Sequence, residues 1–282
     1  MNRSRYPVVR GFGSLLVAVS VLTIGSACNP FGLPATHALE DGAAGMLSSA
    51  TSFEITGRYA AGGSVWKVDL QLVLPATRHL VITTSNGESV EAIIIGSKAY
   101  FRGREFLAQH LSDNPLGPSL VNAAGNGWWK DQTALVPTLS DFTDGASFRA
   151  TFLGSAVTNR TDGQDAVELS GPRGDVYVAS APPFRLLRVH LRSGASVDGV
   201  QDADLQYANV DKDFNLVAPT DVIDFANLST LPPIYTVVTI DTSGCASPCA
   251  VSAKLKNLGG TAGARAPSTV EFTMSDPVSS SS

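Results

Sequence analysis

Charged side chains are scarce in this chain of 282 residues, where Asp, Glu, Lys and Arg account for 16% and hydrophobic residues for 44%. Disordered segments are rich in charge and poor in apolar residues, so this composition excludes a chain that is mostly an unfolded tether. Basic residues are the scarcer kind, with 20 Lys and Arg against 25 Asp and Glu. Because nucleic-acid binding depends on neutralising phosphates with lysine and arginine, we expect no nucleic-acid partner.

The short motifs of common enzyme sites are absent. The sequence contains no Gly-x-Ser-x-Gly, His-Glu-x-x-His, P-loop or Rossmann glycine pattern. The run that starts at Asp211 begins like a calcium-binding loop, but Leu216 and Val222 stand where that loop needs glycine and glutamate. We therefore expect no enzymatic activity, no metal site and no cofactor.

Histidine is rare, and its four residues are scattered along the chain. His190 is expected on the polar side of a strand, where it is interpreted as a solvated residue and not as a catalytic base. Asp202 and Asp204 lie two apart on another expected strand and could pair for acid–base chemistry. The favoured interpretation is again a solvated face.

Cysteine occurs three times, at Cys28, Cys245 and Cys249. The last two are close neighbours in the stretch Cys245-Ala246-Ser247-Pro248-Cys249. In an oxidising compartment this arrangement favours a disulfide with a local stapling role. A metal site is the alternative, but no histidine or third thiol is nearby and the spacing is not that of a zinc knuckle.

The N-terminus has the layout of a secretory signal peptide. Arg3, Arg5 and Arg10 precede a short apolar run, and no acidic residue occurs among the first 27. Cys28 follows the small residues directly, which resembles a bacterial lipobox, although Gly25 stands where Leu, Val or Ile is usual. We expect cleavage before Cys28 and its attachment to diacylglycerol and palmitate-like acyl chains; a plain cleaved signal and an uncleaved anchor are the alternatives.

This signal predicts residues 1–27 as a lipoprotein signal peptide and residues 28–36 as a tether. The protein would then be anchored to the cell membrane through Cys28, on its extracytoplasmic face, because two acyl chains anchor stably. The 255 residues that remain carry 17 basic and 25 acidic groups, a formal charge of −8. Attachment through anionic headgroups alone is therefore disfavoured.

The pattern of apolar residues predicts an α+β fold. Residues 37–50 have helical spacing, and the chain then switches to the alternation typical of strands. Short helices are expected in residues 104–124 and a longer helix in 139–153. The expected strands are residues 53–59, 66–72, 78–84, 88–95, 98–102, 127–130, 164–170, 175–180, 184–192 and 202–210. Hairpin-length connections indicate an antiparallel sheet with helices on one face.

A long antiparallel sheet curls, so helices packed in its concave face leave either an apolar cavity or a solid core. The alternating pattern alone does not distinguish a cavity from a solid core, and a solid core is enough to explain it. If a cavity is present, the inward-alternating residues would line it. These are Val68, Leu70, Leu72, Leu80, Ile82, Val167, Leu169, Val176, Val178, Leu187 and Val189.

Several stretches resemble a known family. They are Phe53-Glu54-Ile55-Thr56-Gly57, residues 90–100, Gly127-Trp128-Trp129, residues 165–169, residues 183–188 and Asp221-Val222-Ile223-Asp224. Together they resemble the LppX/LprG-type actinobacterial lipoproteins over roughly Leu39 to Phe225. The resemblance implies a half-open antiparallel barrel packed on helices, similar to the LolA/LolB lipid carriers, in residues 37–230. It also implies binding or transfer of a lipid or acylated molecule in an apolar cavity.

Residues 231–282 depart from that family. Three runs are expected to be strands, at 234–240, 251–260 and 268–273, and they are similar to part of an immunoglobulin-like module. We expect a small all-β extension stapled by the disulfide. Its presence supports an alternative function, a lipid-anchored scaffold or sensor of the cell envelope that binds a protein partner through this extension and carries no lipid ligand.

Overall fold

The fold is of the α+β class, as the sequence predicts. A computed structural model describes residues 33–154, 157, 159–246 and 249–260. Cys28, the signal residues and the expected strand at 268–273 lie outside these residues. The chain divides into two units after Ala35, and the helices and strands belong to the second. None of the described helices has both the length and the apolar composition that crossing a bilayer requires.

The first half of the chain forms one helix, a run of hairpins and two more helices, as expected. These elements are α1 (Thr36–Ser49), β1 (Ser52–Ala61), β2 (Ser64–Val73), β3 (Thr77–Thr84), β4 (Ser89–Ile95), β5 (Lys98–Arg102), α2 (Arg104–His110), α3 (Gly117–Ala124) and β6 (Trp128–Asp131). The turn between β1 and β2 consists of Gly62 and Gly63, both with positive φ. Two such residues suit the twist of a tight hairpin.

The middle and last parts contain the remaining elements. They are η1 (Thr133–Leu135), α4 (Ser140–Thr143), α5 (Gly145–Phe152), β7 (Asn159–Asp162), β8 (Ala166–Ser170), β9 (Gly174–Ala179), β10 (Leu186–Leu191), β11 (Ser196–Val197), β12 (Val200–Ala208), β13 (Val222–Ile223), η3 (Leu228–Thr230), β14 (Tyr235–Asp241) and β15 (Ser252–Asn257). The helix expected over 139–153 is split, because Asp144 is extended and caps α5 by accepting a hydrogen bond from Ser147 N at 2.8 Å. Strands β7, β11 and β13 were not expected; each has at most four residues.

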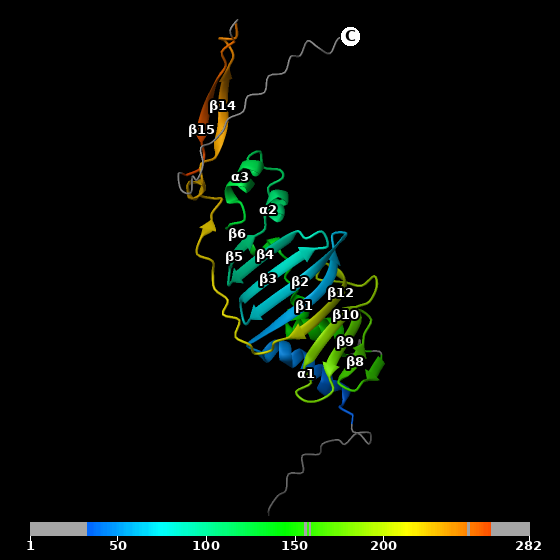
Figure 1. Cartoon of the computed structure of the whole chain (residues 1–282). Coiled ribbons are helices and arrows are strands. Elements are labelled where there is room, and N and C mark those ends of the chain that lie inside the picture. The colour runs from blue at the N-terminus through cyan, green and yellow to red at the C-terminus, as the bar shows by residue number, and fades with distance from the viewer. Residues whose placement is uncertain (1–32, 155–156, 158, 247–248, 261–282) are drawn as a thin grey trace, which may run out of the picture. The chain divides into compact units, whose positions relative to one another are not determined.

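Thirteen strands form one sheet, in the order β13-β6-β5-β4-β3-β2-β1-β12-β10-β9-β8-β7 with β11 beside β12 (Figure 1). Neighbouring strands are antiparallel except β13 and β6, which are parallel. The expectation of a wholly antiparallel sheet is wrong at this edge. After β12 ends at residue 208, residues 209–221 form a long connection to β13, which pairs with β6. A parallel pair needs a long connection of this kind, because a tight hairpin can only join antiparallel strands. The described strands do not close into a barrel.

One face of the sheet, here called the inner face, carries the core. Helices α1 and α5 pack against each other and touch β9, and α1 also touches β10, while α2 touches β4. The buried side chains of these helices and strands form one hydrophobic cluster. The opposite, outer face carries polar groups, such as the pair Arg188–Asp204 and Glu91 with His79 and Arg102.

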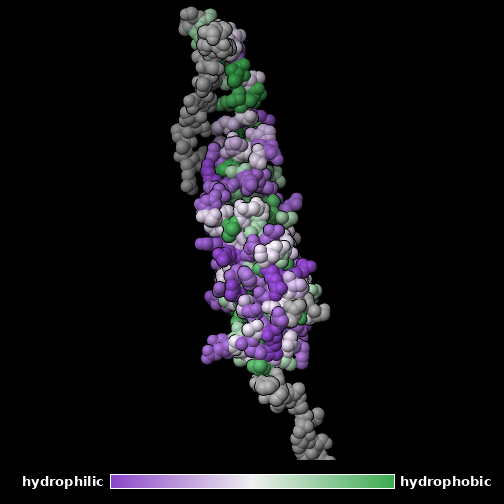
Figure 2. All heavy atoms as spheres, turned by 90° about the vertical axis from the view of Figure 1, so that its right-hand side faces the viewer, coloured by the Kyte–Doolittle hydropathy of each residue, from purple (hydrophilic) through white to green (hydrophobic). Residues whose placement is uncertain are grey.

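Beyond the sheet, β14 and β15 form a two-stranded antiparallel hairpin. Its base is packed, since Leu231 and Ile234 are buried with Leu120 of α3 in a small second cluster. Cys245 and Cys249, in the loop between the two strands, are joined by the predicted disulfide. Figure 2 shows apolar atoms gathered on the hairpin, where Val237 and Ile240 are 51% and 60% exposed.

Candidate functional site

The residues predicted to line a cavity lie on the inner face, with one exception. Ten of the eleven are buried there: Val68, Leu70, Leu72, Leu80, Ile82, Val167, Leu169, Val176, Val178 and Val189. Leu187 is only half buried, because β10 has an irregularity between Leu186 and Arg188 where it pairs with β9. Leu186 takes the inward position in its place, opposite Val178. A bulge of this kind cannot be read from alternation.

The interior under β8–β10 is solidly filled. Phe142, Phe148 and Phe152 form a chain of ring contacts, with centroids 5.5 Å and 5.1 Å apart, and are at most 1% exposed. Val176 and Val178 of β9 have no exposed surface at all. A side chain that a water-sized sphere cannot touch borders no void large enough for water. This half of the sheet therefore has a solid core, which is one of the two outcomes that the alternating pattern allows.

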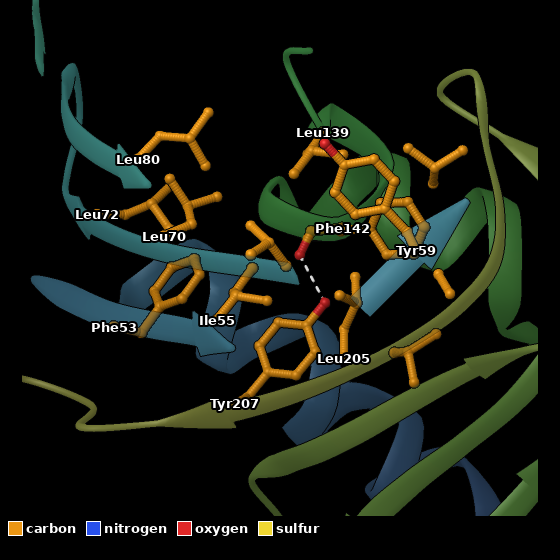
Figure 3. Close-up of a cluster of buried hydrophobic side chains, with 14 of the residues drawn as sticks. Phe53, Ile55, Tyr59, Leu70, Leu72, Leu80, Leu139, Phe142, Leu205 and Tyr207 are labelled. Atoms are coloured by element: carbon orange, nitrogen blue, oxygen red, sulfur yellow. Dashed lines mark hydrogen bonds between the residues drawn. The ribbon is translucent and has the colours of Figure 1, made fainter. Parts of the chain in front are cut away.

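Phe142 also covers the middle of the sheet, where side chains from β1, β2, β3 and β12 point toward it and toward Leu139 (Figure 3). The Tyr207 hydroxyl donates a hydrogen bond to the Phe142 carbonyl at 2.9 Å. Burial of this phenol raises the pKa of Tyr207 above its usual value, so the hydroxyl keeps its proton. The contact thus joins β12 firmly to α4.

An apolar hollow of about 320 Å³ opens at one end of this covered region. Its walls come from β1–β4, α2, the end of η1 with the residues after it, and the turn before β12. They include Tyr59, Trp66, Ile82, Phe106 and Val136. Burial raises the pKa of the Tyr59 phenol to about 12, which reflects the low polarity of its surroundings. The volume reaches the lower end of the range found for small-molecule pockets.

A second hollow, of about 560 Å³, opens at the other end and is called the Arg78 hollow here. Leu47, Leu72 and Leu74 supply its apolar wall. Its polar lining includes Ser48, Thr77, Ser140, Thr143 and Asp144 as well as Arg78. Ile82 lines the apolar hollow and Arg78 the second one, four residues apart on β3, which corresponds to about 13 Å along a strand.

Residues 132–144, called the covering segment here, link β6 to α5 and line both hollows. Leu135–Pro137 border the apolar hollow, and Thr138, Ser140, Thr143 and Asp144 border the Arg78 hollow. Between them, Leu139 and Phe142 are buried on the inner face, at 1% and 0% exposure. The covering segment therefore fills the space that separates the two hollows.

Three side chains from outside the covering segment hold it to the sheet by hydrogen bonds. Arg78 Nη1 donates to the Thr138 carbonyl at 3.1 Å, and the Tyr207 hydroxyl donates to the Phe142 carbonyl. Asp198, in the turn before β12, accepts from Asp141 N at 2.6 Å and from Ser140 Oγ at 3.3 Å. Regular structure within the segment is short, with three residues in η1 and four in α4.

The covering segment also contains a strained residue. Leu139 has φ 52° and ψ 35°, the left-handed conformation. For a bulky side chain that conformation is an outlier and costs on the order of 1–3 kcal/mol. It is retained here because burial of Leu139 and the three attachments hold the segment in place.

Arg78 is the residue that the sequence reasoning missed. It pairs with Leu72 and Ile94, both buried, so it occupies an inner-face position of β3 in line with Leu80 and Ile82. The signal was present in the sequence, since strict alternation back from Ile82 and Leu80 reaches a cation at 78. Burial lowers the pKa of the Arg78 guanidinium from its usual value, and among the described residues it has no acidic partner within ion-pair distance.

The outer-face residues considered for acid–base chemistry do not form a catalytic pair. Asp204 accepts two hydrogen bonds from Arg188, at 2.6 and 2.8 Å, and these hold the pKa of Asp204 below its usual value. Asp202 has φ 46° and is exposed. His190 lies at a hollow with Arg58 and Asp202; it is half-buried, and its Nδ1 is buried without a hydrogen-bond partner among the described residues. Asp202 is therefore solvated, as expected, whereas His190 is solvated only in part.

No protein-family model matches this chain, and a search of curated proteins finds no relative.

Proposed function

We propose that the protein is a lipoprotein, anchored through Cys28 to the extracytoplasmic face of the cell membrane, that binds or transfers an acylated molecule. One observation carries the proposal: a segment of short elements covers the inner face of β2–β4 and has a hollow at each end. The acyl chain would lie on the inner face between the two hollows, where Leu139 and Phe142 now pack. We also propose that the curved sheet is a half-open barrel of the LppX/LprG type.

Displacement of the covering segment is energetically feasible. Exposing Leu139 and Phe142 costs about 1.5–3 kcal/mol each, and loss of the hydrogen bonds to Arg78, Tyr207 and Asp198 costs about 1 kcal/mol each. Each buried methylene of a ligand contributes about 0.8 kcal/mol, so roughly ten methylenes offset the opening. Relief of the strain at Leu139 favours the open form further. The filled interior then corresponds to the ligand-free state.

A wedge in the apolar hollow tests the proposal. The full chain is titrated with a long-chain fatty acid that carries a fluorophore at its methyl end. Ile82→Trp fills the hollow and is expected to weaken binding at least tenfold. Val81→Trp is the matched control, because Val81 pairs with Asp69 and Glu91 on the outer face of the same strand. It is expected to bind as the wild type does.

Two results would contradict the proposal. One is a wild-type protein that binds no acyl probe and carries no lipid in native mass spectrometry after isolation from membranes. The other is equal binding by both tryptophan variants. Urea unfolding of each variant checks that it is folded, since a wedge in a packed site costs about 1–3 kcal/mol.

The hairpin supports a second candidate function, a lipid-anchored scaffold or sensor. Its strand register places Tyr235, Val237, Ile240 and Leu255 on one apolar face, all at least 37% exposed. Lys254 and Lys256 pair with Thr239 and Thr236 on the other face. A two-stranded hairpin alone is only marginally stable. An extended, acidic segment of an envelope protein would complete it by adding a strand and pairing with the lysines.

Removal of the hairpin separates the two candidates. The chain is cut after Ile234, because Leu231 and Ile234 are buried with Leu120 and a cut at 231 would damage that cluster. A carrier keeps its acyl-probe affinity after the cut. A scaffold loses co-purification of its partner after the cut. In the full chain, a photoreactive group at position 237 should cross-link to that partner, and the variant with Lys254 and Lys256 both changed to Glu should weaken the cross-link.

A further inference from the structure

Arg78 breaks the apolar pattern of the inner face at the mouth of a hollow. Its guanidinium lines a space whose apolar wall is made of Leu47, Leu72 and Leu74. The single hydrogen bond described for it goes to a neutral acceptor, the Thr138 carbonyl. A guanidinium has five N–H donors, so most of its bonding capacity is free for another partner.

The other inner-sheet contacts do not neutralise this cation. The neighbours of Arg78 across β2 and β4 are Leu72 and Ile94. Asp144 is the acidic residue that lines the same hollow, but it forms no ion pair with Arg78 and its carboxylate caps α5. The Ser147 N–H holds the pKa of Asp144 below its usual value, so this carboxylate is charged and repels a second anion toward the Arg78 side.

A partly desolvated charge without a counter-ion is costly, and an anion delivered by a ligand would remove that cost. Arginine binds carboxylates and phosphates through two parallel hydrogen bonds, which are stronger than bonds between neutral groups. The hydroxyls of Ser48, Ser140 and Thr143 line the same space, but they donate to the Ala44 carbonyl, the Asp198 carboxylate and the Leu139 carbonyl. The hollow thus combines a cation with an apolar wall that leads to the inner face.

We propose that Arg78 binds the anionic headgroup, a carboxylate or phosphate, of an acyl ligand whose chain lies under the covering segment. This inference rests on the proposed function and adds the class of ligand and the direction in which it lies. The headgroup occupies the Arg78 hollow and the chain extends along β3 toward Ile82. Binding of the headgroup competes with the Arg78–Thr138 hydrogen bond, so it also releases one attachment of the covering segment.

The test compares ligands that differ only in the headgroup. The full chain is titrated at neutral pH with a long-chain fatty acid, the fatty alcohol of equal length, a lysophosphatidic acid and inorganic phosphate, each competing with the fluorescent probe. Wild type is expected to bind both acids about tenfold more tightly than the alcohol, the size of one charge-assisted interaction. Inorganic phosphate alone is expected not to compete at millimolar concentration.

Substitutions at Arg78 then identify the residue responsible. Arg78→Met should remove the preference for the acids over the alcohol, and Arg78→Lys should restore most of that preference. Arg58→Met is the matched control, since Arg58 pairs with Lys67 and Asp204 on the outer face and is exposed. It should keep the preference.

Four results would overturn the inference. Equal binding of acid and alcohol by wild type, or a preference that survives in Arg78→Met, removes Arg78 from headgroup recognition while acyl binding itself stands. Competition by inorganic phosphate that depends on Arg78 shows a site for a free anion and not for a lipid. If neither acid nor alcohol binds to wild type, the proposed function fails together with the inference.

Discussion

The two halves of the sheet differ in how their inner faces are covered. Over β8–β10 lie α1 and α5, which approach so closely that a Cβ on Gly145 would be 2.4 Å from the Ala44 carbonyl oxygen. Arg149 and Asp41 form an ion pair across the same interface at 2.6 Å. Over β2–β4 lies instead the covering segment, with two short helical pieces, a strained Leu139 and a hollow at each end.

Under the proposed function, this difference separates a support from a binding surface within one continuous sheet. Two helices that interlock at Gly145 cannot move independently without losing close packing. The covering segment is held by hydrogen bonds to three side chains, Arg78, Tyr207 and Asp198, and by its own buried residues, so we expect it to move as a unit. Under the proposed function, residues with the same alternating pattern therefore have different roles. Val176 and Val178 stabilise the fold, whereas Leu70, Leu80 and Ile82 are the residues that a ligand would reach.

Removing a phenylalanine from each half is expected to have the largest effect. Phe142→Ala and Phe148→Ala both delete a ring with no exposed surface, so each should lower the free energy of unfolding by about 3–5 kcal/mol. Only Phe142→Ala should also tighten binding of the acyl probe, because the ligand no longer has to displace the ring. Urea unfolding and probe titration measure the two quantities, and equal changes in binding would remove the distinction between the halves.

Loss of one attachment of the covering segment should have a smaller effect. Tyr207→Phe leaves the Phe142 carbonyl buried without its donor, which should cost about 1–3 kcal/mol. Amide hydrogen exchange should accelerate in residues 139–144 and not in α5. Tyr59→Phe is the matched control, since no hydrogen bond of the Tyr59 hydroxyl is described and burial is similar at 3%. Unchanged exchange in Tyr207→Phe would mean that this bond does not hold the segment.

The sequence predicted most strands and the inner face because both follow from period-two alternation. Strands β1 to β5 and β8, β9, β10 and β12 lie where they were expected, apart from differences of a few residues at their ends. Alternation failed where the backbone is irregular, as at Leu187 in β10. The split between α4 and α5 was not predicted either, because the apolar spacing of Leu139, Phe142, Phe148 and Phe152 continues across it. Asp144 was the available signal, since aspartate is a typical N-cap residue.

The hollows could not be predicted from the sequence. Whether a curled sheet is filled depends on where the rings of Phe142 and Phe148 point, which follows from the tertiary packing of α4 and α5 and not from local pattern. Arg78 was predictable in part. Its inward register follows from alternation, but its lack of an acidic partner depends on residues far away in the sequence, such as Asp144.

The smallest expected effect concerns an ion pair on the outer face of the solidly packed half. Arg188 lowers the pKa of Asp204 in the folded protein, so the pair stabilises the fold above the pKa of the unfolded chain, near 3.9. Asp204→Asn should reduce the free energy of unfolding by about 0.2–1 kcal/mol at pH 7, the usual range for a partly exposed pair. As the pH falls through the folded pKa of Asp204, the difference from wild type should disappear.

Asp202→Asn provides the control for this ion pair, because Asp202 is exposed on the same strand and asparagine tolerates its positive φ. It should leave the free energy of unfolding at pH 7 unchanged. Both variants should bind the acyl probe as wild type does, since the ligand surface proposed here is on the inner face of the other half. A change in acyl affinity in Asp204→Asn would mean that the ion pair between β10 and β12 affects ligand binding at β2–β4. The division of the sheet into a support and a binding surface would then be wrong.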